Sequence, residues 1–61
     1  MPGTFEIFKD KGGQFRWRLK SRNGEPVAAS ESYPTKANAR RGVQAAIRAA
    51  TDAKIVDTTA D

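Results

Sequence analysis

A segment in which every second side chain is apolar constrains the fold of this chain more than any other feature. It runs over residues 14–22 and reads QFRWRLKSR. Its apolar members are Phe15, Trp17 and Leu19, and the cations between them are Arg16, Arg18 and Lys20. A strict period of two predicts a β-strand with one covered and one solvent-exposed face, which is typical of antiparallel sheets.

Two neighbouring segments extend this strand into a predicted three-stranded antiparallel meander. Residues 4–9 (TFEIFK) alternate in the same way, and residues 25–30 (EPVAAS) form a weaker third strand. Pro26 places the start of that third strand at an edge or in a loop, because proline cannot donate a ladder hydrogen bond.

The loops between the strands decide the register. A two-residue turn at Asn23 and Gly24 would pair Leu19 with Ala28, whereas a three-residue loop would pair Leu19 with Val27. We expect three-residue loops in both hairpins, since a slip of one residue would put Val27 on the cationic face. The same register pairs Ile7 with Trp17, Phe5 with Leu19 and Trp17 with Ala29, and gives Gly13 and Gly24 a positive φ.

A helix is predicted over residues 36–50, with Thr35 as its N-cap and Pro34 before it. Its apolar stripe consists of Ala39, Val43, Ala46, Ile47 and Ala50. Gly42 lies beside this stripe, and either a close backbone approach or a neutral position explains it.

The end of the chain carries a short β-branched segment with no turn to return it to the preceding strands. This segment consists of Lys54, Ile55, Val56 and Asp57. We expect one domain over residues 1–61, ordered from about 4 to 57, with a frayed tail at 58–61.

The core is thin for a chain that must fold alone. Twelve large apolar or aromatic side chains are present among 61 residues, with no Cys and no His. Domains this small usually need a disulfide, a metal or a partner subunit, and the first two lack their usual ligands here. We therefore expect a homodimer without cofactor or metal; the alternative is a marginally stable monomer. With no apolar span and no secretory signal, we also expect a cytoplasmic protein.

The motifs together resemble a known family. The order FEIFKDKGGQFRWRL, KSRNGEPVAASESY, TKANARRGVQAAIRAA and DAKIVD is similar to the YegP-like family, short bacterial and archaeal proteins that carry a domain of unknown function. The resemblance implies an α+β fold of order β-β-β-α-β, with the C-terminal strand exchanged in a homodimer of single-copy members. It implies no catalytic residue or ligand. Ser32 departs from the pattern, since relatives tend to have Gly there.

The cationic strand face is the sharpest functional feature. Together with a net charge of +4, it suggests a nucleic-acid, ribosome or acidic-protein surface formed by Phe8, Arg16, Arg18 and Lys20. The alternative, which we favour, is a solvated sheet face with Glu6 opposite Arg18 and Phe8 beside Arg16. We thus expect a non-enzymatic binding or scaffolding domain.

An enzymatic role has one specific candidate. Removal of Met1 would expose Pro2, and tautomerases of similar length use an N-terminal proline as a base. Those chains begin a strand at the proline, whereas here Gly3 intervenes and the strand pattern starts at Thr4. An ordinary frayed start is the favoured interpretation.

Overall fold

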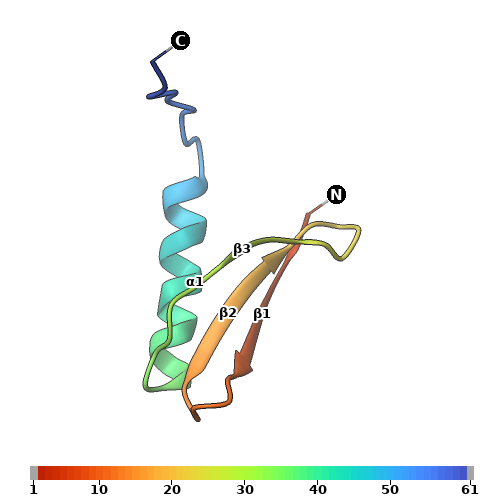
Figure 1. The fold of residues 1–61 in the computed structure, drawn as a ribbon, viewed down its shortest axis with the longest axis vertical. Coiled ribbons are helices and arrows are strands. Elements are labelled where there is room, and N and C mark those ends of the chain that lie inside the picture. The colour runs from red at the N-terminus through yellow and green to blue at the C-terminus, as the bar shows by residue number, and fades with distance from the viewer. Residues whose placement is uncertain (1, 61) are drawn as a thin grey trace.

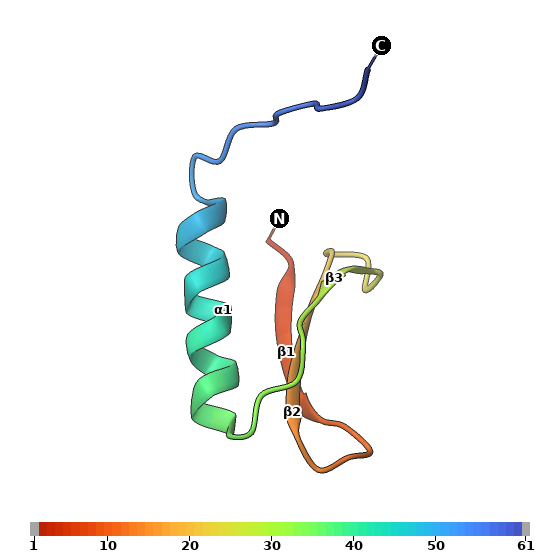
Figure 2. The ribbon, with the colours of Figure 1, turned by 60° about the vertical axis from the view of Figure 1, so that its left-hand side comes forward.

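The fold consists of one antiparallel sheet and one helix. The computed structural model describes residues 2–60, in the order β1 (Thr4–Lys9), β2 (Phe15–Lys20), β3 (Pro26–Ala29) and α1 (Lys36–Ala50). The strands lie side by side in the order β1-β2-β3, and α1 stands on one side of the sheet (Figures 1 and 2). The predicted α+β meander and helix are confirmed.

The first hairpin has the predicted register. Phe5 pairs with Leu19, and Ile7 pairs with Trp17. The loop over residues 11–13 ends in Gly13 with φ 81°, and the second loop ends in Gly24 with φ 87°. Both three-residue loops are confirmed, because in each the flanking residues exchange a backbone hydrogen bond, as in Asp10 N–H to Gln14 O at 2.8 Å.

The register between β2 and β3 differs from the prediction beyond its first pair. Lys20 pairs with Pro26 as the loop requires, but a bulge then shifts the ladder so that Leu19 pairs with Ala28. The predicted Leu19–Val27 pair is therefore wrong. The predicted Trp17–Ala29 pair is wrong too, because Trp17 is bonded to Ser30: the Ser30 N–H donates to the Trp17 carbonyl, and the Ser30 hydroxyl accepts from the Trp17 N–H. Val27 is the extra residue that the bulge inserts into β3 between Pro26 and Ala28, so it has no cross-strand partner on β2 and is left 62% exposed.

Helix α1 begins and ends where the sequence predicts. The Thr35 side chain accepts a hydrogen bond from the Asn38 N–H at 3.1 Å, which confirms Thr35 as the N-cap. At the other end the Thr51 hydroxyl donates to the Ile47 carbonyl at 2.8 Å. The segment before the helix is tied to the sheet, because Tyr33 and Phe15 exchange two backbone hydrogen bonds.

The contact between helix and sheet is narrow. Helix α1 approaches β1 and β2 but not β3, and Ala39 is the one fully buried apolar residue within residues 2–60. A Cβ at Gly42 would overlap the Tyr33 hydroxyl and lie 3.0 Å from Trp17 Nε1. Of the two explanations for Gly42, close backbone approach is therefore the correct one. Trp17 is half-buried there and meets Phe5 edge to face, with ring centroids 5.2 Å apart.

The segment after α1 does not return to the sheet. Residues 53–60 run away from the helix end (Figure 2), and residues 54–57 form no strand within the described chain. Ile55 is 99% exposed and Val56 is 75% exposed. The single chain is therefore β-β-β-α over residues 2–60, without the expected fourth strand. The radius of gyration is 13.5 Å, against about 10.5 Å for a compact domain of this length.

Candidate binding surfaces

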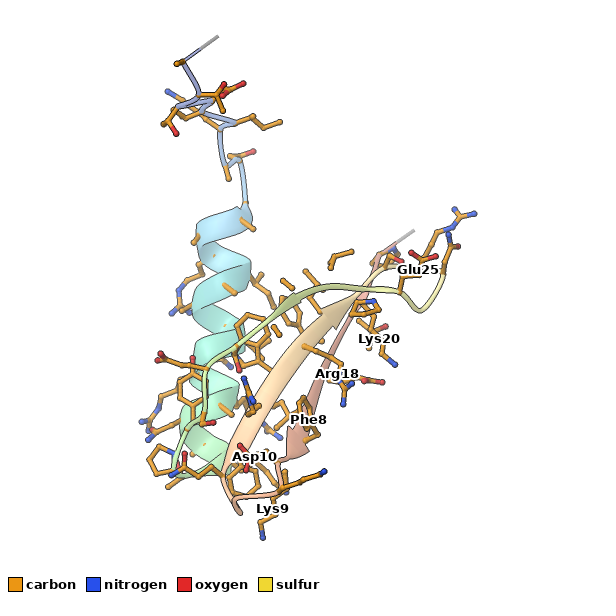
Figure 3. All side chains as sticks on the ribbon, in the orientation of Figure 1. Phe8, Lys9, Asp10, Arg18, Lys20 and Glu25 are labelled. Carbon is orange, nitrogen blue, oxygen red and sulfur yellow. The ribbon has the colours of Figure 1, made fainter. Side chains whose placement is uncertain are left out.

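The side of the sheet that faces away from α1 carries the predicted cationic surface, which we call the open sheet face. It is formed by Glu6, Phe8, Arg16, Arg18 and Lys20, which alternate with the side chains under the helix. Figure 3 shows Phe8, Arg18 and Lys20 in a row along this side. The structure thus brings all four predicted residues together on β1 and β2.

Glu6 forms ion pairs with two of the three cations of this face. Its Oε1 lies 3.4 Å from Arg18 Nε and 3.3 Å from Lys20 Nζ. The predicted Glu6–Arg18 cross-strand pair is confirmed. These side chains are between 31% and 42% exposed, so water screens the attraction and the pairs stabilise the sheet only modestly.

Phe8 and Arg16 also have partners inside the chain. The Arg18 guanidinium carbon lies 4.1 Å from the Phe8 ring centroid, so the ring stacks diagonally with Arg18. Phe8 is opposite Arg16 in the ladder as predicted, but Arg16 instead donates a hydrogen bond to the Ser30 carbonyl at 3.1 Å. Every cation of the open sheet face is therefore engaged with the protein itself.

Asp10 connects the first hairpin to the segment that leads into α1. Its carboxylate accepts hydrogen bonds from the Gln14 N–H, the Gly12 N–H and the Ser32 hydroxyl, at 3.0, 2.9 and 3.1 Å. These bonds, that from Gln14 foremost, hold the pKa of Asp10 below its ordinary value of 3.8, with a smaller contribution from the charge of Arg16. Ser32 therefore has a structural role in this connection.

Residues 2–60 contain no group of three acidic, His or Cys side chains suited to a metal ion, and no pocket. Pro2 is exposed and lies outside β1. No helix among these residues has the length and apolar character needed to span a membrane.

A second cationic surface, on α1, was not predicted as a site. The side of the helix that faces away from the sheet carries Arg40, Arg41, Gln44 and Arg48, all exposed, and we call it the outer face of α1; Lys36, also exposed, lies at its edge in the first turn. Helix α1 contains no acidic residue, and no ion pair to these cations exists within residues 2–60. The sequence does contain the signal for this surface, in the absence of Asp and Glu from residues 36–50.

Comparison with known proteins places this arrangement in a family. A family model described as "Domain of unknown function (DUF1508)" matches residues 10–57, and so includes both loops, the helix and the exposed C-terminal segment. The chain belongs to the DUF1508 family. The expected YegP-like resemblance is confirmed, since the UPF0339 protein YegP of Shigella flexneri is 46% identical over 43 residues, covering 70% of this chain and 39% of that protein.

Other DUF1508 relatives differ in length. A UPF0339 protein of Treponema denticola is 46% identical over 57 residues, covering 93% of this chain and 98% of its own. A UPF0339 protein of Stutzerimonas stutzeri, from the 5′ region of a ptx operon, is 48% identical over 52 residues, but the match spans only 47% of its length. The chain thus matches the whole of one relative and about half of the other.

The fold of the DUF1508 domain is also found in a solved structure. The NMR solution structure of a protein from Haloferax volcanii has a TM-score of 0.79 to this chain and 34% sequence identity. The match covers 93% of this chain and 97% of that one. Nothing in the family description points to catalysis.

Proposed function

We propose that this protein is a cytoplasmic, non-enzymatic binding or scaffolding domain that works as a homodimer. In this dimer, residues 54–57 of each chain form a strand that is exchanged with the partner chain. The observation that carries the proposal is the position of Ile55 and Val56. They extend beyond the helix as two large apolar side chains without cover, while both outer strands of the sheet have a free edge. Exchange of a terminal element is a low-cost route to a dimer.

The amount of exposed surface supports this proposal. One chain exposes 5134 Å², whereas a compact monomer of 6.7 kDa is expected to expose about 3,900 Å². The excess of about 1,200 Å² is comparable with the roughly 800 Å² that each partner buries in a stable interface. The exposed apolar side chains of Val27 and Ile47 lie on elements outside the narrow helix–sheet contact.

The mass of the protein in solution, measured across a range of concentrations, tests the dimer. We expect twice the chain mass, with dissociation only on strong dilution. A strictly monomeric species at high concentration would reject the exchange of residues 54–57 and with it the scaffolding role.

Nucleic-acid, ribosome or acidic-protein binding through the open sheet face is the second candidate. Its support is a flat face with three cations against one carboxylate and an aromatic ring, Phe8, for stacking. Replacing Arg16 and Arg18 by Ser should reduce the salt dependence of binding if this face contacts phosphates. An unchanged salt dependence would reject the face.

Tautomerase-like chemistry at Pro2 is a remote third candidate. Its support is only the exposed position of Pro2 at the start of the described chain. Protein lacking Met1, assayed with simple enol substrates, should show no activity above buffer.

A further inference from the structure

The outer face of α1 has a charge pattern that helix stability does not explain. The positive end of the helix dipole lies at its N-terminus, where acidic residues stabilise a helix, yet the first turn has none and begins with Lys36. Lys36 and Arg40 are four residues apart, a spacing at which like charges repel. Arg48 in the last turn is favourably placed for the dipole, but these two features at the start of α1 both destabilise it, so a binding partner accounts for them better than helix stability does.

Three arginines of this face form a row. At 3.6 residues per turn, Arg40, Arg41 and Arg48 lie within about 100° around the helix axis, and Arg40 to Arg48 covers about 12 Å along it. Ala39 lies on the opposite side, buried against the sheet. The three arginines therefore share one broad side of a regular helix and are directed into solvent.

The two cationic surfaces differ in what already holds their charges. On the open sheet face Glu6 and the Ser30 carbonyl engage the cations. Within residues 2–60 the cations of α1 have one such partner, the Asn38 side-chain oxygen, which accepts a hydrogen bond from Arg41 Nη1 at 3.1 Å. A polyanion approaching α1 displaces no carboxylate. The outer face of α1 is thus the stronger candidate for anion binding.

We propose that the outer face of α1 binds the phosphate backbone of a nucleic-acid duplex. Arginine offers paired N–H donors that suit phosphate oxygens, and three cations held on one side of a helix over about 12 Å are complementary to a stiff, regularly charged backbone. The face has no aromatic side chain on which unpaired bases would stack, so a duplex fits it better than a single strand. Such contacts fix position without reading sequence.

A membrane surface fits the same charges less well. Membrane-bound amphipathic helices insert an apolar face, but α1 packs Ala39 and Val43 toward the sheet and exposes Ala37 and Gln44 between its cations. The row is complete within one chain, so the proposal does not depend on the homodimer.

Filter binding of a short DNA duplex and of the matching RNA duplex, at several salt concentrations, tests this proposal. With three arginine–phosphate contacts, binding should weaken about 40-fold between about 50 and 200 mM salt. Arg40→Gln together with Arg48→Gln leaves one contact, and the weakening should fall to about 3- to 4-fold. Glutamine is close to arginine in helix propensity, so circular dichroism should show an unchanged helix.

A control variant has the same net charge as the helix variant but keeps the outer face of α1 intact. Lys11→Gln with Arg22→Gln removes two exposed loop cations and should retain the 40-fold weakening. Arg40→Lys with Arg48→Lys should retain it as well, because the charges remain. The two duplexes distinguish DNA from RNA as the source of the phosphates.

Three outcomes would overturn the proposal. The first is an equal loss of salt dependence in the helix variant and the loop control, which would show that only net charge matters. The second is no duplex binding at low salt. The third is tighter binding to polyglutamate or to vesicles of anionic lipid than to either duplex at the same salt.

Discussion

The two ends of this molecule differ in how well their elements contact one another and cover their apolar side chains. At the end where α1 begins, the β1–β2 loop, the Tyr33 bridge and the tight approach at Gly42 join every element to its neighbours. At the end where α1 finishes, Val27, Ile47, Ile55 and Val56 are all at least half exposed. In Figure 1 the helix and the sheet diverge toward that second end.

The difference indicates which contacts form within one chain and which need a second chain. The first end, which we call the closed end, is held together by contacts within one chain, so its stability should not depend on protein concentration. The second end has apolar side chains with nothing to cover them, and in the proposed homodimer a second copy supplies the cover. Substitutions at the two ends should therefore be distinguishable by their dependence on concentration.

The largest effect is expected from Ile55→Asp together with Val56→Asp. In the proposed homodimer each chain buries both side chains, and each burial stabilises the dimer by about 1.5 kcal/mol. Loss of all four burials weakens the dimer by about 6 kcal/mol, or about 10⁴-fold in affinity. Sedimentation equilibrium should show the mass of one chain.

The control for this variant is Thr58→Asp, which adds a charge just beyond the exchanged segment and should leave the dimer intact. If the double variant has the same mass as the unmodified protein, residues 54–57 do not join the two copies and the contrast between the ends disappears.

A smaller effect is expected at the closed end from Gly42→Ala. The new methyl group overlaps the Tyr33 hydroxyl and crowds Trp17 Nε1, at a cost that exceeds the gain in helix propensity by about 1–2 kcal/mol. The free energy of unfolding, measured with urea at two protein concentrations, should fall equally at both.

Two further variants make this test specific. Gly12→Ala adds the same methyl group where the nearest atom is Asp10 Oδ1 at 3.5 Å, an ordinary contact, and should be near neutral. Adding Tyr33→Phe to Gly42→Ala removes the overlapping oxygen and should restore part of the loss. No restoration would mean that the Tyr33 hydroxyl is not what makes Gly42 necessary.

The smallest effect concerns pH. The pKa of Asp10 is lower in the folded protein than its ordinary value of 3.8, so its contribution to stability is complete above pH 3.8 and is lost as the pH falls through the depressed pKa. Ser32→Ala removes one donor to this carboxylate and should bring its pKa nearer to 3.8, giving a shallower loss of stability in acid. A carboxyl titration by NMR measures the shift directly, and an unchanged Asp10 pKa would contradict the hydrogen bond from Ser32.

Local patterns predicted the closed end well because its elements follow from neighbouring residues. The alternation in residues 14–22, the glycines at loop ends and the Thr35 cap each determine structure within a few positions. The register of β3 was missed because a bulge adds Val27 to the strand, and the apolar pattern at Val27 favoured the pairing that the bulge prevents.

The candidate surfaces were predicted only in part. The alternation placed Phe8, Arg16, Arg18 and Lys20 on one face, but which ring an arginine stacks on depends on side-chain rotamers, and the contact is diagonal rather than directly opposite. The outer face of α1 was overlooked because an exposed cation on a helix is unremarkable until the structure shows which cations lack a partner.

The position of Trp17 has a practical consequence. It is the sole tryptophan of the chain, and its indole lies half-buried against the helix at Gly42, with Nε1 shielded from solvent and donating no hydrogen bond within residues 2–60. Indole emission moves to longer wavelength when the ring enters water. A single optical signal, with no added dye, therefore reports in real time whether α1 is docked on its sheet.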